Sequence, residues 1–315
     1  MVFLVASVAC AICGAPDSAP SRFQPIDFEY WIVPDPPLLV RRCAVCGSEF
    51  VVPRPSIPQL ISFYPLHYHA YNEDHGSVAG KLVGVRGRAR RKQYRALLPG
   101  RSPIRLFDVG AGDCRQFDDL NSEGGFEFGG VEVKPEMVQA ARARGYEVVE
   151  GTLEAMEMSG QNERWDIVTM YQVVEHVLAP QMMMDKAFAM LRAGGVVLGQ
   201  LPCIDSLDHA VFGRHWAGYH FPRHLQMFTK GSLRVILERA GFVDIEVRSA
   251  LHLQAALSLQ NVIVDNFGGR EKMRFGKTPY YALLLLVMAP FCLLEALLGR
   301  GGMMNFMARK PEPAR

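Results

Sequence analysis

Hydrophobic and polar positions follow two alternating periods along the chain from Ile104 onward. Short runs in which nearly every residue is apolar predict buried strands, and segments with apolar residues at helical spacing predict the helices between them. The expected strands precede Asp108, end at Val133 and span 146–149, 165–170, 195–201, 243–247 and 304–308, and the expected helices span 115–120, 135–144, 172–177 and 233–240. This alternation predicts an α/β fold with a doubly wound, mostly parallel sheet of seven strands.

A second pattern is the almost wholly apolar stretch 280–298, which is close to the length of a membrane span and contains Pro290. A single crossing would prevent the strand at 304–308 from returning to the sheet beside 243–247. We therefore expect residues 251–302 to form a helical apolar insertion before the last strand. It could lie on a membrane surface, dip in and out, cover the active site, or be a buried or dimer helix. Basic side chains that suit anionic headgroups are Arg270, Lys272, Arg274, Lys277 and those of the expected basic helix at 81–98.

Four of the seven cysteines form two Cys-x-x-Cys-Gly pairs, Cys10 with Cys13 and Cys43 with Cys46. Each pair is typical of a zinc knuckle, in which a turn directs both thiolates at one ion, and two knuckles complete a tetrahedral site. An odd cysteine count with paired spacing fits a reducing compartment better than a disulfide framework. The sequence predicts structural zinc in a zinc-ribbon-like domain at 1–55. Unrelated thiol pairs or a redox motif are the alternatives.

The length of 315 residues allows one large domain or two smaller ones. We expect a connector and basic helix at 56–100, the core at 101–250, and the last core strand and tail at 303–315, besides the zinc domain and the insertion. The formal net charge of +2 neither indicates nor excludes a nucleic-acid binder. The N-terminal ten residues have no basic segment before their apolar run, so we expect no signal peptide and a cytoplasmic protein.

The run from Leu106 to Cys114 predicts a buried strand that ends in a glycine-rich turn. Gly110 and Gly112 can adopt backbone angles closed to other residues and let a ligand approach the main chain. Glu132 follows about twenty residues after the turn, at the end of the next strand, where an acidic side chain accepts hydrogen bonds from ribose hydroxyls. Asp108 beside the turn would repel a pyrophosphate and attract a cation, which favours a sulfonium cofactor over a dinucleotide.

With these residues in view, segment 104–247 resembles the class I S-adenosylmethionine-dependent methyltransferases of the small-molecule type, whose sheet is Rossmann-like. The resemblance rests on Asp108–Asp113, Glu132, Gly151–Glu154, Trp165–Val177 and Leu191–Gly195, and the runs His215–Leu225, Phe228–Thr229 and Gly241–Phe242 resemble a subgroup with an N-terminal four-cysteine domain. Two departures are Cys114, where the turn often has glycine, and Thr152, where some relatives have aspartate.

The resemblance implies S-adenosylmethionine as cofactor and a role for each matching residue. Asp108 and the backbone of Gly110, Ala111 and Gly112 would hold the methionine part, and Glu132 would hold the ribose. Leu153 would flank the adenine, and Tyr171 and Gln172 would line the site near the sulfonium. An in-line displacement needs a base only when the acceptor must lose a proton.

Candidate bases or metal ligands are Glu175, His176, His220 and His224. Related methyltransferases hold a divalent metal with a Glu-x-x-Glu-His motif and a later histidine, but Gln172 replaces the first glutamate here. The alternative is that Glu175 and His176 cap a helix and His224 braces a loop. If one residue acts as the base, we expect His224 or His176.

The sequence thus predicts a cytoplasmic methyltransferase, peripheral at the inner membrane face, that acts on a small-molecule, lipid or glycan-precursor acceptor. The alternatives are a nucleic-acid methyltransferase and a non-catalytic zinc-containing scaffold. The first lacks an Asn-Pro-Pro-Tyr-type motif after strand five, and the second would predict an eroded cofactor turn. The acceptor atom and the oligomeric state stay open.

Overall fold

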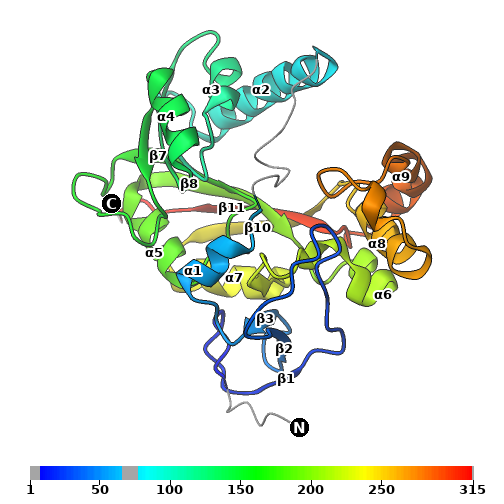
Figure 1. The fold of residues 1–315 in the computed structure, drawn as a ribbon. Coiled ribbons are helices and arrows are strands. Elements are labelled where there is room, and N and C mark those ends of the chain that lie inside the picture. Colours follow the sequence, from blue (N-terminus) through cyan, green and yellow to red (C-terminus); the bar gives the residue numbers. More distant parts are fainter. Residues whose placement is uncertain (1–7, 66–76, 314–315) are drawn as a thin grey trace.

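The computed structural model describes residues 8–65 and 77–313 (Figure 1). Its central sheet has seven strands in the order β10-β11-β8-β7-β4-β5-β6. These strands are β4 (Ile104–Val109), β5 (Phe126–Glu132), β6 (Glu147–Glu150), β7 (Trp165–Tyr171), β8 (Leu191–Pro202), β10 (Val243–Ala250) and β11 (Met303–Arg309). Only β11 runs against its neighbours β8 and β10. The mostly parallel sheet and the return of the last strand beside β10 are therefore confirmed.

Helices cover both faces of the sheet, as a doubly wound fold requires. They are α2 (Ser77–Leu97), α3 (Arg115–Leu120), α4 (Pro135–Ala143), α5 (Pro180–Met190) and α7 (Lys230–Arg239). Phe117 of α3 and Val138 of α4 share one buried cluster with Leu106 of the sheet. Met184 of α5 and Leu233 of α7 share the other cluster. Because β4, β5 and β7 run parallel to one another, their carboxyl ends meet at the same edge of the sheet.

The helix expected at 172–177 is wrong. The chain forms turns between β7 and α5, and α5 begins only at Pro180. Gln172 has a φ of +57°, in the left-handed region, so a right-handed helix cannot start there. The apolar residues in this segment pack a loop rather than one face of a helix.

The N-terminal part of the chain forms a four-stranded antiparallel sheet in the order β1-β2-β3-β9. Cys43 ends β2, and the other three N-terminal cysteines lie outside the strands. Its strands are β1 (Ser18–Pro20), β2 (Leu39–Cys43), β3 (Glu49–Val52) and β9 (Gln226–Met227), and a short helix α1 (Ile57–Ser62) follows β3. Because β9 lies between β8 and α7 of the core, the N-terminal sheet is completed by a distant segment and is joined to the core by backbone hydrogen bonds.

The expected insertion between the last two strands is a pair of packed helices, α8 (Ala255–Phe267) and α9 (Tyr281–Leu297). A short helix η4 (Arg270–Lys272) lies between them, and α6 (Leu207–Phe212), η2 (Gly213–His215) and η3 (Ala217–Tyr219) lie before β9. In the described part of the chain, no helix combines the length and the apolar character that crossing a membrane requires.

Candidate functional site

The glycine-rich turn projects from the carboxyl end of β4 and is fixed to the neighbouring strand. The N–H groups of Gly110 and Ala111 both donate to the carbonyl of Val131, at 2.9 and 3.1 Å. Gly110 and Gly112 have φ values of +78° and +56°, which glycine adopts without strain. A Cβ at Gly112 would meet no described atom within 4 Å, so the main chain is open to a ligand there.

Cys114, the departure from the familiar turn, also has a left-handed backbone, with φ +63°. Glycine reaches this conformation more easily than any other residue, which explains why related turns often have glycine at this position. The Cys114 side chain is fully buried and packs beneath the turn with Ala111. The departure therefore costs some backbone strain and leaves the open face of the turn unchanged.

Asp108 is a buried carboxylate at the base of the turn. It accepts hydrogen bonds from the Thr169 hydroxyl and, at 3.3 Å, from the Gln116 side-chain amide. Burial raises the pKa of Asp108 to about 7, and these two hydrogen bonds and the charge of Arg90 oppose the shift. A buried carboxylate with so little cationic compensation favours the arrival of a positively charged ligand group.

Glu132 joins the end of β5 to the turn. Its two carboxylate oxygens accept the Gly112 N–H at 2.9 Å and the Lys134 N–H at 3.0 Å. The side chain is only 9% exposed, and its position on the strand next to β4 sets it beside the open face of Gly112. The structure therefore brings Asp108, Gly110, Ala111, Gly112 and Glu132 together around one turn.

The other expected cofactor residues differ in exposure. Leu153 is buried in the same apolar cluster as Val131, so only a small part of its surface could meet an adenine ring. Gln172 is exposed and donates its N–H to the carbonyl of Gln200 at 2.8 Å. Tyr171 ends β7 and is partly buried.

Two residues of α2 contact this site and were not expected from the sequence. The Arg90 guanidinium lies over the Tyr171 ring at 4.5 Å, and the Tyr94 and Tyr171 hydroxyls are 3.4 Å apart. The sequence shows that the segment 81–98 is basic. It does not show that one face of this helix packs against the end of β7, because that contact depends on the tertiary structure.

A histidine cluster lies near the turn and is built from two segments, the loop after β7 with His176 and the loop before β9 with His220 and His224. The loop after β7 contacts the turn, since a Cβ at Gly110 would lie 3.1 Å from the Val173 side chain. Glu175 is 1% exposed, and neither of its carboxylate oxygens has a hydrogen-bond partner among the described residues. Burial raises the pKa of Glu175 to about 8.

His224 faces Glu175 across a gap of 3.9 Å between Nε2 and Oε1. Its Nδ1 lies 2.8 Å from the carbonyl of Gly218, so Nδ1 carries the proton and Nε2 presents a lone pair toward Glu175. Burial lowers the pKa of His224 far below its usual value, with the neighbouring His176 and His220 adding to the effect. The ring is therefore neutral at ordinary pH.

His176 completes the cluster, because one ligand atom each from Glu175, His176 and His224 lies within 4.8 Å of the other two. The Nδ1 atom of His176 is 3.0 Å from the Tyr64 hydroxyl and 3.2 Å from the Arg223 carbonyl. These contacts hold the ring in place. The expected helix cap by Glu175 and His176 is not formed, since no helix begins there.

His220 has a different role from the other histidines. Its Nε2 accepts from Arg223 at 2.8 Å, so its Nδ1 donates to Glu29 at 3.1 Å. Arg223 is fully buried and forms a two-pronged ion pair with Asp27, at 3.0 and 2.9 Å. This network ties the loop that carries His224 to the N-terminal sheet.

The four N-terminal cysteines converge on one point, and the Sγ atoms are 3.8 Å apart for Cys10 and Cys46 and 3.5 Å apart for Cys13 and Cys43. Four thiolates about 2.3 Å from a zinc ion lie roughly 3.8 Å from one another, so the spacing fits a tetrahedral zinc site. Gly14 and Gly47 follow the two pairs with left-handed backbones, and each donates its N–H to the carbonyl of the first cysteine of its pair. Both turns thus have the geometry of zinc knuckles.

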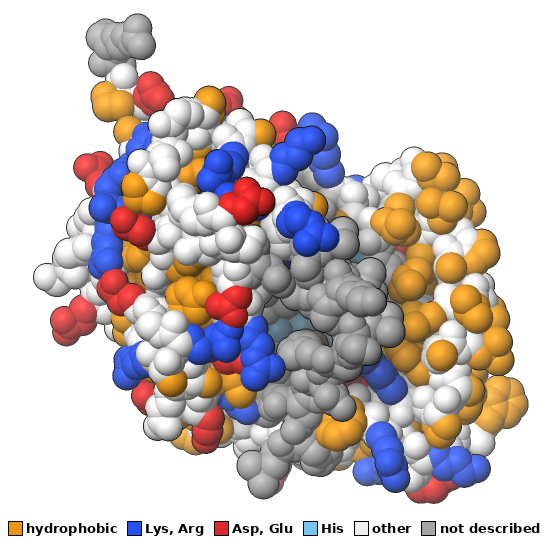
Figure 2. Space-filling model, turned by 90° about the horizontal axis from the view of Figure 1, so that it is seen from above, with side chains coloured by type: hydrophobic (Ala, Val, Ile, Leu, Met, Phe, Trp, Pro, Cys, Tyr) orange, Lys and Arg blue, Asp and Glu red, His pale blue; other side chains and the backbone are white. Residues whose placement is uncertain are grey.

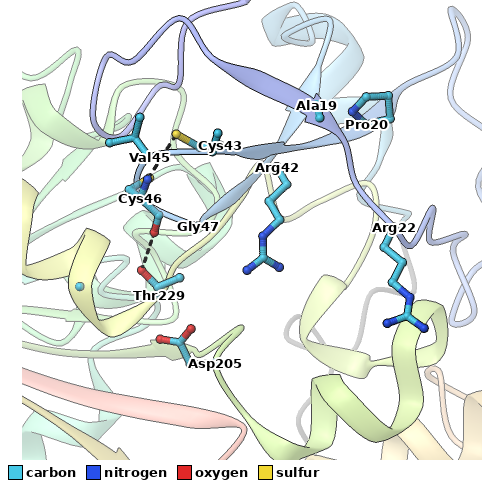
Figure 3. Close-up of a pocket in the computed structure, with 12 residues that line it drawn as sticks. Ala19, Pro20, Arg22, Arg42, Cys43, Val45, Cys46, Gly47, Asp205 and Thr229 are labelled. Atoms are coloured by element: carbon cyan, nitrogen blue, oxygen red, sulfur yellow. Dashed lines mark hydrogen bonds between the residues drawn. The ribbon is translucent and has the colours of Figure 1, made fainter.

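A cavity of about 740 Å³ lies beside the second knuckle, between β2 and the start of α7 (Figure 3). Its lining includes Arg22, Arg42, Asp205 and Thr229, and none of the cofactor-turn residues. In Figure 3 the Arg42 side chain points into the hollow from β2, and Arg22 lies beside it on the loop after β1. We do not assign methyl transfer to this cavity, because it lacks the glycine turn and acidic strand end.

The chain was compared with known proteins. A family model described as a methyltransferase domain matches residues 84–247, which is more than half of the chain. A search of curated proteins found no match. The low identities and scores of the similar solved structures show nothing about this chain's substrate.

Three of these structures illustrate the range of sequence identity, TM-score and coverage. A possible histamine N-methyltransferase from Thermotoga maritima is 18% identical, with a TM-score of 0.45 over 73% of this chain and 91% of that one. Phosphoethanolamine N-methyltransferase 2 from Haemonchus contortus is 16% identical, with a TM-score of 0.49 over 71% of this chain and 53% of that one. A putative sarcosine dimethylglycine methyltransferase from Galdieria sulphuraria is 12% identical, with a TM-score of 0.49 over 80% of this chain and 96% of that one. The family match over more than half of the chain shows that the protein belongs to the methyltransferase domain family.

Proposed function

We propose that the protein transfers the methyl group of S-adenosylmethionine to a small-molecule, lipid or glycan-precursor acceptor. The observation that carries this proposal is the open main chain at Gly112 between two buried carboxylates, Asp108 and Glu132. A pyrophosphate would be repelled by both carboxylates, whereas the ammonium and sulfonium groups of this cofactor are attracted by them.

We further propose a role for each residue around the turn. Asp108 and the backbone from Gly110 through Ala111 to Gly112 hold the methionine part of the cofactor. Glu132 accepts hydrogen bonds from the ribose, and Leu153 flanks the adenine. Tyr171 and Gln172 line the space near the sulfonium. Each role is supported by position at the carboxyl ends of adjacent parallel strands, where ligands bind in open α/β sheets.

For the acceptor, we propose that Glu175, His176 and His224 receive the proton that an acceptor hydroxyl, amine or carbon acid loses. The Nε2 lone pair of neutral His224 is the proposed proton acceptor, and Glu175 stabilises the imidazolium that forms. Bound S-adenosylmethionine supplies the electrophilic methyl carbon. A divalent cation held by the same three side chains is the alternative, and supplementing chelated enzyme with Mg²⁺ or Mn²⁺ separates the two, because a base needs no metal.

A methylation assay tests the proposed function. Purified protein is incubated with isotopically labelled S-adenosylmethionine and a cell extract divided into aqueous and lipid fractions, and mass spectrometry locates the labelled methyl group. The proposal expects label in a small molecule or lipid with wild type and none with Asp108→Ala. Label that is confined to nucleic acid would contradict the proposed acceptor class, and equal labelling by Asp108→Ala would contradict the proposed cofactor site.

We propose structural zinc at Cys10, Cys13, Cys43 and Cys46, held as a tetrahedral thiolate site. Metal analysis of the purified protein should give one zinc per chain, and the double variant Cys43→Ser with Cys46→Ser should lose it. Cys203→Ser is the matched control, since this buried cysteine lies outside the four-cysteine site. Equal zinc content in the double variant and the control would rule this site out.

For its location, we propose a cytoplasmic protein that is peripheral at the inner membrane face. The observation that favours this location is the exposed apolar surface of α9. Fractionation of cells into cytosol and membranes tests it, and recovery only in the cytosol at low salt would contradict the peripheral association.

A further inference from the structure

Helix α9 is apolar on two opposite faces, and only one of them is covered. Its covered face contributes Leu284, Met288 and Cys292 to a cluster that includes Ala255 and Ala256 of α8. The opposite face carries six side chains that are each 50–76% exposed, namely Leu283, Leu286, Val287, Leu293, Leu294 and Leu297. Spacings of three, four and seven residues place them along one side of the helix. So long an exposed apolar stripe indicates an interaction surface.

Two more apolar side chains are exposed on this helix pair, Leu298 just after α9 and Phe267 at the end of α8, which is 84% exposed. Figure 2 shows hydrophobic side chains gathered along the edge of the molecule that these two helices form in Figure 1. Glu295 on the covered side accepts N–H groups from Gly302 at 3.1 Å and from Asp208 at 3.2 Å. These bonds fix α9 to the body of the protein, so its outer face is held in one orientation.

Cationic side chains flank both ends of the stripe. Four exposed cations precede the helix, namely Arg270, Lys272, Arg274 and Lys277, and exposed Arg300 follows it. Glu271 is the only exposed acid between 270 and 300, because Glu295 is buried. An apolar face between two cationic ends is complementary to a bilayer interface, where acyl chains lie next to anionic phosphates.

We propose that the outer face of α9 docks on an anionic lipid bilayer, with the helix axis parallel to the membrane plane. At about 1.5 Å per residue, seventeen residues span roughly 26 Å, and the body of the protein holds the inner face, so the helix lies in the interface. This inference deepens the proposed function, on which it rests, because it favours a lipid or a lipid-linked molecule as the acceptor.

A second copy of the chain is a poorer occupant of this face. Packing two α9 stripes about a twofold axis would place cationic ends of one copy against cationic ends of the other, in either helix direction. An anionic bilayer neutralises both ends at once. The charges therefore favour lipid over self-association.

Vesicle co-sedimentation of the full chain tests the proposal. The probes are vesicles of phosphatidylcholine alone and of phosphatidylcholine with phosphatidylglycerol. We expect wild type to bind the anionic vesicles at least about tenfold more tightly than the neutral ones, and less tightly as salt is raised. The double variant Leu286→Ser with Leu297→Ser should lose about tenfold or more of this affinity.

Charge reversal supplies a second variant, since Lys272→Glu with Lys277→Glu should weaken binding to anionic vesicles and leave the weak binding to neutral ones unchanged. Ile61→Ser and Met182→Ser are matched controls, because these exposed apolar residues lie on α1 and α5. Wild type that stays in the supernatant, or binding that both sets of variants leave intact, would overturn the proposal. So would an α9-dependent dimer in gel filtration that binds no vesicles. S-adenosylmethionine affinity measured on the same samples shows separately whether the proposed methyltransferase site is intact.

Discussion

Two neighbouring regions of the candidate site differ in how they hold a buried carboxyl group. At the glycine turn, Asp108 and Glu132 each accept hydrogen bonds from nearby donors. At the histidine cluster, Glu175 has no hydrogen-bond partner among the described residues and faces a histidine lone pair. The first arrangement is preorganised for binding. The second leaves a buried carboxyl group without a hydrogen bond, which lowers the stability of the fold, as sites of proton transfer often do.

The largest effect is expected from Glu175→Gln, which removes the ionisable carboxyl group and keeps the shape of the side chain. If Glu175 stabilises protonated His224, turnover should fall by about 10²–10⁴-fold while the affinity for S-adenosylmethionine stays the same. Glu127→Gln, on an exposed acid paired with Arg105, is the matched control. Unchanged turnover in Glu175→Gln would show that the two regions do not differ in the proposed way.

Gly112→Val should affect only the glycine turn, where the cofactor is proposed to bind. A β-branched side chain would fill the open space at the turn and strain a backbone with φ +56°, so cofactor affinity should fall by about a hundredfold. Calorimetry measures this affinity, and circular dichroism checks that the fold is retained. Gly100→Val is a control for strain, because it has a similarly positive φ and open surroundings away from the turn. If both variants bind the cofactor like wild type, the turn is not the cofactor site.

The pH dependence of stability offers a smaller but specific effect. The pKa of Glu175 is about 8 in the folded chain and near 4.5 when unfolded, so the folded state binds the proton more tightly between these values. Its contribution therefore makes the protein less stable as pH rises from about 4.5 to about 8, with no further change above. Asp108 contributes in the same direction up to about pH 7.

Urea unfolding at pH 7 and pH 8.5 reports on Glu175 through the difference between wild type and Glu175→Gln, because the other titrating groups are common to both proteins. Wild type should lose stability over the interval, and Glu175→Gln should lose less. Parallel pH profiles for the two proteins would mean that Glu175 is not protonated in the folded state at neutral pH.

Tyr94→Phe should have the smallest effect. It removes one hydroxyl from the contact with Tyr171, and a single neutral hydrogen bond is worth about 1 kcal/mol. We expect a change in cofactor affinity of about fivefold or less and no change in the pH profile of turnover. A loss of cofactor affinity as large as that in Gly112→Val would show that Tyr94 contacts the cofactor directly.

The two regions also differ in how far the sequence predicts them. The glycine turn is local, since Asp108 and Gly112 are four residues apart and Glu132 lies at the end of the next strand. The zinc knuckles are local in the same sense. These features were predicted because the strand period, the positions of the glycines and the spacing of the cysteines can each be recognised within a few consecutive residues.

The histidine cluster depends on contacts between distant segments. Tyr64 reaches His176 across 112 residues, and the left-handed Gln172 turns the chain where a helix was expected. The covering of Tyr171 by Arg90 of α2 likewise comes from tertiary packing. The periodicity of the sequence gives no signal for such contacts. It also cannot show which apolar face of α9 is covered, because that depends on the packing of α8.

Calorimetric titration of S-adenosylmethionine into wild type and into Glu132→Ala tests the central claim most directly. The carboxylate of Glu132 sits beside the open main chain at Gly112, so wild type should bind the cofactor and the variant should bind it at least about tenfold more weakly. Glu127→Ala, on the exposed part of the same strand, should bind like wild type. Equal affinity in wild type and Glu132→Ala, or no binding by wild type, would contradict the account.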